Sequence, residues 1–161
     1  MLEDGSVYEG TARGDFKETA CEIVFNTSMT GYVEILTDPS YAGQGVVMTY
    51  PMIGNYGISR EDFESERLQP SAFIVHELSS DPSNFRCTDT IENLLKEYNI
   101  PCISGVDTRA VVKKLRESGT MRGVLTSDIG DRERLMDVIK SFRQIDLVGS
   151  VTAKQTKVYG E

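Results

Sequence analysis

The chain has 161 residues and a formal net charge of −8, with 39% apolar and 26% charged residues, which fits one globular domain. An acidic surface repels phosphate backbones and anionic lipids, so nucleic acids and membranes are excluded as expected partners. Residues 1–5 are polar and predict no signal peptide, and no apolar run is long enough to span a bilayer.

The three cysteines, Cys21, Cys87 and Cys102, have no spacing typical of a disulfide framework or a metal site. A sparse, odd set of cysteines is typical of a reducing compartment, so we expect free thiols and a cytoplasmic protein. A reactive thiol needs a helix N-terminus or a histidine beside it to lower its pKa, and the sequence predicts neither for these residues.

The first half of the chain is predicted to consist of short strands and turns. Runs of β-branched and aromatic residues predict strands over residues 6–12, 21–26, 45–50 and 71–78. Tyr32, Ile35 and Leu36 have i, i+3, i+4 spacing, which predicts one or two helical turns within residues 30–37. Asp38 and Pro39 are expected to end these turns, because a proline disfavours helical geometry in the residue before it.

The second half alternates strands with helices. Asp89, with Glu92 three residues later, is expected to cap the first helix, Asp107 to cap the second, and Gly119 to end the second. A third helix is predicted over residues 131–142. The predicted apolar faces are Ile91, Leu94, Leu95 and Tyr98; Ala110, Val111 and Leu115; and Leu135, Val138, Ile139 and Phe142.

Two further strands are predicted over residues 101–104 and 122–125. Residues 147–161 show no helical period, so we interpret residues 1–146 as one domain and residues 147–161 as a linker. Strands that come first and then alternate with helices predict a mixed α/β layered domain, of the β/β/α swivelling type. A doubly wound nucleotide-binding fold is not expected, because no glycine-rich phosphate motif follows a predicted strand.

No catalytic residue and no metal site are predicted in this chain. The single histidine, His76, falls inside a predicted apolar strand without a nucleophile motif, which favours a structural or surface role. Glu61, Asp62, Glu64 and Glu66 surround Phe63, and such a charge run is typical of a solvated face rather than of metal ligands.

Residues 26–57 form the densest segment without a structural explanation. They are rich in glycine, proline, serine and threonine around a single predicted strand. Long ordered loops on a rigid scaffold usually bind something, so we expect binding or docking here. The alternative is a tight set of purely structural turns.

Several motifs of this segment and its surroundings carry a resemblance to a known family. They are LEDG (2–5), EIVFNT (22–27), MTGY (29–32), EILTDPSY (34–41), YPMIGN (50–55), PSNFR (82–86), GVDTR (105–109) and LRESG (115–119). In this order they resemble the N-terminal domain of the small, glutamine-hydrolysing subunit of carbamoyl phosphate synthetase. The chain departs from the family at Met1, where a strand usually precedes LEDG, and at Cys21, where glycine is common.

The resemblance implies a non-catalytic docking domain, inactive alone, of a cytoplasmic ligase that makes carbamoyl phosphate from ATP, bicarbonate and glutamine for arginine biosynthesis, pyrimidine biosynthesis or both. The implied partners are the large subunit and a C-terminal amidotransferase domain of the same polypeptide, which carries the catalytic cysteine. No cofactor is expected on this chain, because ATP and metal are expected on the large subunit.

The resemblance also implies individual site residues. Ser40 is expected to reach the glutamine pocket of the neighbouring amidotransferase domain; the alternative is that Ser40 only caps its own turn. Candidate interface residues are Asn26, Thr27, Gly31, Tyr32, Asp38, Tyr41 and Asn55.

Two other functions are kept as alternatives. One is a stand-alone regulatory module that binds a small ligand through the glycine-rich segment. The other is a phosphohistidine carrier, which would need His76 at a glycine-framed helix start.

Overall fold

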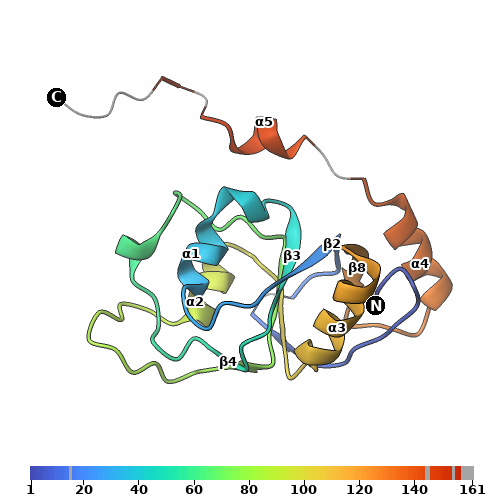
Figure 1. Ribbon diagram of the computed structural model, residues 1–161, viewed down its shortest axis with the longest axis horizontal. Helices are drawn as coiled ribbons and strands as arrows, with labels where there is room; N and C mark the ends of the chain where they lie inside the picture. Colours follow the sequence, from blue (N-terminus) through green and yellow to red (C-terminus); the bar gives the residue numbers. More distant parts are fainter. Residues whose placement is uncertain (15, 144–145, 154, 157–161) are drawn as a thin grey trace.

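A six-stranded mixed sheet forms the centre of the computed structural model, which describes residues 1–14, 16–143, 146–153 and 155–156 (Figure 1). The four inner strands run parallel, and both edge strands are antiparallel to their neighbours. The order across the sheet is β1 (Thr11–Arg13), β7 (Cys102–Ser104), β5 (Ala72–Ile74), β3 (Gln44–Met48), β2 (Thr19–Asn26) and β8 (Met121–Leu125). The prediction of a mixed α/β domain, with strands first and then strands alternating with helices, is confirmed.

Helices cover both faces of this sheet (Figure 1). Alternate residues of a strand point to opposite faces, so Val46 packs in one core with α1 (Tyr32–Thr37) and α2 (Ile91–Glu97). Val47, the next residue, packs in a second core with α3 (Thr108–Ser118). A smaller third core joins Val124 of β8 to α4 (Arg132–Ser141).

A second, two-stranded sheet interrupts what the sequence predicted as one strand over residues 71–78. β5 ends at Ile74, the chain bends at His76, and β6 (Glu77–Leu78) then pairs in parallel with β4 (Met52–Ile53). The single-strand prediction is wrong because β5 pairs with β3 and β7, whereas β6 pairs with β4. His76 therefore lies in a bend and not in the middle of a strand.

Helix caps follow the sequence with one exception. Asp107 accepts a hydrogen bond from the backbone amide of Ala110, Asp131 caps α4 in the same way, and Gly119 ends α3 with a φ of 83°. The cap of α2 is Thr90, whose hydroxyl accepts from the amide of Asn93. Asp89, the predicted cap, lies one residue before the actual cap, and its carboxylate accepts a hydrogen bond from the backbone amide of Thr90.

The predicted apolar faces are buried to different degrees. Those on α2 and α3 are buried at Ile91, Leu94, Leu95, Val111 and Leu115, and that on α4 at Leu135 and Ile139. Ala110 and Val138 are only half-buried, as are Tyr98 and Phe142, which follow the last residues of α2 and α4 as C-caps.

The first predicted strand, over residues 6–12, is shorter and later than expected. Only Thr11–Arg13 pairs in the sheet, as β1. Before it, Gly10 lies so close to the backbone of β7 that a Cβ would stand 2.5 Å from the carbonyl oxygen of Ser104. β3 also ends earlier than predicted, at Met48, and the amide of Thr49 makes a final hydrogen bond to the carbonyl of Asn26 on β2.

A short helix, α5 (Leu147–Val151), lies in the segment predicted to have no helical structure. Asp146 caps it by accepting from the amide of Gly149, and the hydroxyl of Ser150 donates to the carbonyl of Leu147. The prediction is wrong here because five residues are too few to show a helical period. Residues 154 and 157–161 of the predicted linker lie outside the described residues.

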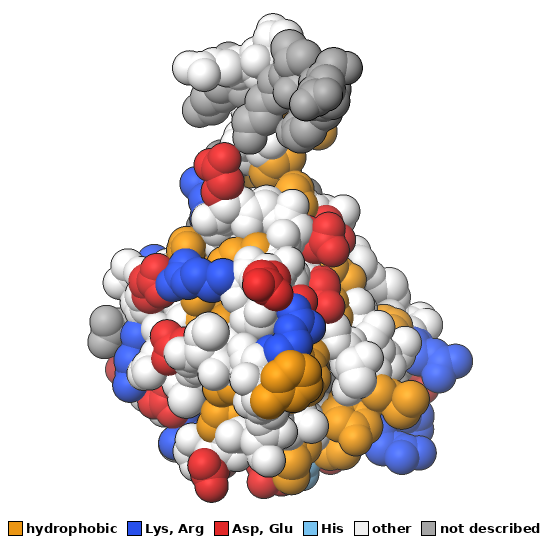
Figure 2. All heavy atoms as spheres, turned by 90° about the vertical axis from the view of Figure 1, so that its left-hand side faces the viewer, with side chains coloured by type: hydrophobic (Ala, Val, Ile, Leu, Met, Phe, Trp, Pro, Cys, Tyr) orange, Lys and Arg blue, Asp and Glu red, His pale blue; other side chains and the backbone are white. Residues whose placement is uncertain are grey.

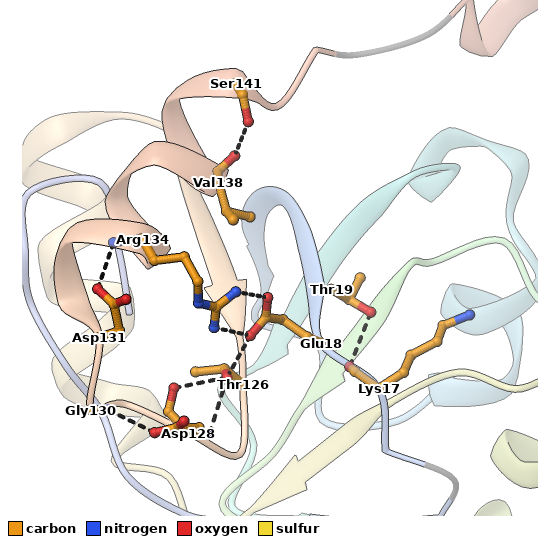
Figure 3. Close-up of polar contacts among 10 residues, drawn as sticks. All are labelled: Lys17, Glu18, Thr19, Thr126, Asp128, Gly130, Asp131, Arg134, Val138 and Ser141. Atoms are coloured by element: carbon orange, nitrogen blue, oxygen red, sulfur yellow. Dashed lines mark hydrogen bonds and ion pairs between the residues drawn. The ribbon is translucent and has the colours of Figure 1, made fainter.

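An exposed ion pair fastens α4 to the sheet (Figure 3). The two terminal guanidinium nitrogens of Arg134 donate to the carboxylate of Glu18, at 2.7 and 2.8 Å, and the Thr126 hydroxyl donates to the same carboxylate at 2.8 Å. These hydrogen bonds, with that from Arg134 the strongest cause, lower the pKa of Glu18 to about 2.

The lowered pKa predicts a pH-dependent contribution of Glu18 to stability. The folded pKa lies below the unfolded value of about 4.3, so the contribution is full above that value and is lost as the pH falls towards about 2. We expect wild type to exceed Glu18→Gln in unfolding free energy at pH 7, and the difference to shrink between pH 5 and pH 3. Urea unfolding across this range measures it, with the exposed Glu9→Gln as control; a pH-independent difference would contradict the assignment.

Candidate functional site

The turn that carries Ser40 is a 3-10 helix, η1 (Pro39–Tyr41), placed directly after α1. The carboxylate of Asp38 accepts from the backbone amide of Ser40 at 2.8 Å, and the carbonyl of Asp38 accepts from the amide of Tyr41 at 3.1 Å. Pro39 fixes φ at the first position of the turn. Asp38 therefore caps the turn, and Ser40 does not.

The Ser40 side chain is exposed, and its hydroxyl makes no hydrogen bond to any residue in the described part of the chain. A hydroxyl can both donate and accept, so a polar ligand or a neighbouring domain can use both functions. The braced backbone holds the hydroxyl in place at low entropic cost.

Asn26 and Tyr41, two of the interface candidates, are brought together. The Asn26 side-chain amide donates to the Tyr41 hydroxyl at 2.8 Å, which ties the end of β2 to η1. The Asn26 carbonyl accepts from the amide and from the hydroxyl of Thr49, each at 3.0 Å. Asn26 is thus a junction between β2, β3 and the Ser40 turn.

Tyr32 belongs to the core. Its ring is 1% exposed and stacks on Tyr56 with ring centroids 4.2 Å apart, and its hydroxyl donates to the carbonyl of Gly57 at 2.7 Å. Burial raises the pKa of Tyr32. Its side chain cannot reach a partner surface, so a substitution at Tyr32 would act on an interface only through the fold.

Tyr56 has a role that the sequence did not reveal. Its hydroxyl accepts from the backbone amides of Gly31, at 2.7 Å, and of Tyr32, at 3.2 Å. These are free amides at the start of α1, where a glutamate at the third helical position often reaches back to the amide of the cap residue. Glu34 holds that position, but Tyr56 accepts the hydrogen bond from the Gly31 amide in its place. One buried carboxylate oxygen of Glu34 has no hydrogen bond within the described residues.

The remaining interface candidates lie at or near the surface. Thr27 and Asn55 are exposed, while Gly31 and Asp38 are half-buried. Within residues 26–57, hydrogen bonds join Asn26 to Tyr41, and separately join Gly31 and Tyr32 to Tyr56.

The tail of the domain runs close to the Ser40 turn. α5 lies above η1 in Figure 1, and Leu147 of α5 packs on Gly43, where a Cβ would stand 2.9 Å from the Leu147 side chain. Gly43 has a φ of +74°, so a side chain here would be strained as well as crowded.

The thiols and the histidine do not assemble a nucleophile. Burial raises the pKa of both Cys21 and Cys102 to about 12, and the Cys87 sulfur donates to the carbonyl of Asp89. His76 is exposed, with Nδ1 3.1 Å from the carbonyl oxygen of Val106. Among the described residues, no three His, Cys, Asp or Glu side chains are placed to hold a metal ion.

A cavity of about 410 Å³ lies between the N-terminal segment and the sheet. Its walls are mostly apolar, with Leu2, Ile23 and Val47 among them, and no predicted site residue lines it. Within the described ranges, no helix has the length and apolar character needed to cross a bilayer.

Comparison with known proteins finds one family across most of the chain. Residues 1–125 match the family described as carbamoyl-phosphate synthase small chain, CPSase domain. The chain is 49% identical over 154 residues to the carbamoyl phosphate synthase small chain of Caldanaerobacter subterraneus subsp. tengcongensis, covering 96% of this chain and 41% of that protein. It is 50% identical over 161 residues to the protein of the same name from Archaeoglobus fulgidus, covering 97% and 44%. The chain therefore spans less than half the length of these curated relatives.

Separate roles for Asp38 and Ser40 predict separate effects on stability. Asp38→Ala removes the cap and should lower the unfolding free energy by about 0.5–2 kcal/mol, by analogy with helix caps. Ser40→Ala removes a hydroxyl that makes no internal bond and should change the unfolding free energy by less than about 0.5 kcal/mol. Chemical denaturation of both variants measures this, and a loss at Ser40 equal to that at Asp38 would show that the hydroxyl supports the turn.

Proposed function

Because the chain belongs to the carbamoyl-phosphate synthase small chain family, through the CPSase domain of that family, we propose that it is the non-catalytic docking domain of a glutamine-hydrolysing subunit. The parent enzyme joins ammonia from glutamine with bicarbonate at the expense of ATP, and the product, carbamoyl phosphate, serves arginine and pyrimidine biosynthesis. ATP and its metal bind to the large subunit, and the assembly works in the cytoplasm, in keeping with three free thiols.

The observation that carries the proposal is the Ser40 turn. Its hydroxyl is exposed and without an internal hydrogen bond among the described residues, and its backbone is fixed by Asp38 and Pro39. α5 leaves the domain beside this turn, packed on Gly43. A domain reached through α5 would therefore lie near Ser40, whose hydroxyl then binds the polar end of glutamine in the pocket of that domain.

The chemistry of the thiols supports a docking role rather than catalysis by this domain. Hydrolysis through an acyl-enzyme needs a nucleophile activated by a neighbouring base. The thiols of Cys21 and Cys102 are buried, and this burial raises the pKa of each thiol to about 12. We place the catalytic cysteine and its base in an amidotransferase domain of the same polypeptide, within the length of the relatives that this chain does not span.

The 161-residue chain alone is predicted not to hydrolyse glutamine and not to form carbamoyl phosphate. Ammonia release by the purified chain, measured with a coupled dehydrogenase assay, should equal the buffer blank. Release above the blank that disappears on substitution of Cys21, Cys87 or Cys102 would overturn the prediction.

Ser40→Ala is predicted to raise the KM for glutamine in a full-length small chain, because the hydroxyl bonds to the substrate. A lost hydrogen bond of about 0.5–1.5 kcal/mol corresponds to a two- to tenfold increase in KM. Ser127→Ala, which also removes an exposed hydroxyl, is the control and should leave KM unchanged. An unchanged KM for Ser40→Ala would remove Ser40 from the glutamine pocket.

A further inference from the structure

Phe85 exposes almost its whole side chain to solvent. It is 98% exposed, more than any other large hydrophobic residue among those described. Burying a phenylalanine side chain stabilises a fold, and Phe85 makes no such contribution to this one. Single exposed hydrophobic residues are common, so exposure alone does not define a site.

The loop around Phe85, residues 79–89, is held firmly on both sides. The amides of Ser79 and Ser83 donate to the carbonyls of Ile53 and Asn55, at 2.8 and 2.9 Å. At the other end, the amide of Thr88 donates to the carbonyl of Ile58 at 2.8 Å. The Phe85 loop is therefore fastened to residues 53–58 at both ends.

The tip of the Phe85 loop is a closed turn. The side chain of Asn84 accepts from the amide of Arg86 at 2.9 Å, and the carbonyl of Asn84 accepts from the amide of Cys87 at 3.1 Å. Arg86 pairs with Asp62 at 2.7 Å and with Glu61 at 3.3 Å. The ring is presented on an ordered backbone, so a partner that binds it would spend little entropy on ordering the loop.

Two more exposed hydrophobic residues belong to the same part of the fold. Met52, 40% exposed, lies on β4 beside β6, and Met29, 69% exposed, lies in the loop joined to Tyr56 through Gly31. Figure 2, which views the left-hand side of Figure 1, shows hydrophobic side chains between acidic and basic groups on the lower half of that side. Phenylalanine and methionine are enriched at the centres of protein interfaces.

The charges beside the ring are mainly acidic. Arg86 is balanced by Asp62, which leaves Glu61, with a side chain 84% exposed, and Asp81 as exposed carboxylates near the loop. The whole chain carries a net charge of −8. Basic side chains on a partner, placed around its contact with the ring, would therefore be attracted to these carboxylates.

We propose that Phe85 is the anchor of a docking surface for a separate protein chain, one that offers an apolar pocket to the ring and basic residues at the rim. This inference rests on the proposed function, under which the separate chain is the large synthetase subunit. In Figure 1, α5 lies at the top and β4, beside the Phe85 loop, lies at the bottom. A domain that follows α5 is therefore on the Ser40 side, and the Phe85 side is open to another chain.

The test measures binding of a full-length small chain to its large subunit by isothermal titration calorimetry. Phe85→Ala should raise Kd at least tenfold, Phe85→Leu should raise it less, and higher salt should weaken binding of the wild type. Val148→Ala, which truncates another exposed hydrophobic residue at 75% exposure, should bind as the wild type does. Thermal unfolding of Phe85→Ala should match the wild type, since the ring supports nothing in the fold.

Two results separate this inference from the proposed function. If the wild type binds the large subunit and Phe85→Ala binds equally well, the anchor is elsewhere and only the inference is overturned. If the wild type does not bind the large subunit, the proposed partner is wrong and the inference falls with it. Self-association of the wild type that Phe85→Ala abolishes would assign the ring to a contact between two copies and would also overturn the inference.

Discussion

The hydroxyl of Tyr56 connects the two segments that lead to the Ser40 turn and to the Phe85 loop. By accepting from the amides of Gly31 and Tyr32, it joins the start of α1 to the segment of residues 53–58. The stacked rings of Tyr32 and Tyr56 bury the same junction. The Ser40 turn follows the far end of α1, and the Phe85 loop is fastened to residues 53–58, so this connection links the segments that lead to both candidate contacts.

This arrangement suits a domain that works between two partners. Ser40 is presented next to α5, and Phe85 is presented from the opposite side, beside β4 (Figure 1). Each is an exposed side chain on a backbone fixed by hydrogen bonds, with the chemistry that its partner would need. A hydroxyl suits a polar substrate, and a ring suits an apolar protein pocket.

The packing inside the sheet shows how the thiol of Cys21 is accommodated. Cys21 lies on β2, and its side chain is completely buried between β2 and its neighbours. Gly45 of β3 is the register partner of Ile23, and a Cβ at Gly45 would stand 2.7 Å from the Cys21 sulfur. Gly45 thus leaves the space that the Cys21 thiol occupies, and this burial keeps the thiol protonated.

The sequence by itself determined the features that depend on residues close along the chain. Asp107 and Gly119 bound α3, and the i, i+3, i+4 spacing at Tyr32 places α1, because caps and helix faces involve residues three or four positions apart. Ser40 and Asp38 could be singled out from their motif, but their different roles could not. Only the tertiary structure decided that β5 and β6 separate at His76, that Tyr32 is buried, that Tyr56 takes the bond available to Glu34, and that Phe85 stays exposed. Each of these depends on contacts across the fold, and no local pattern records which distant strand or ring will arrive there.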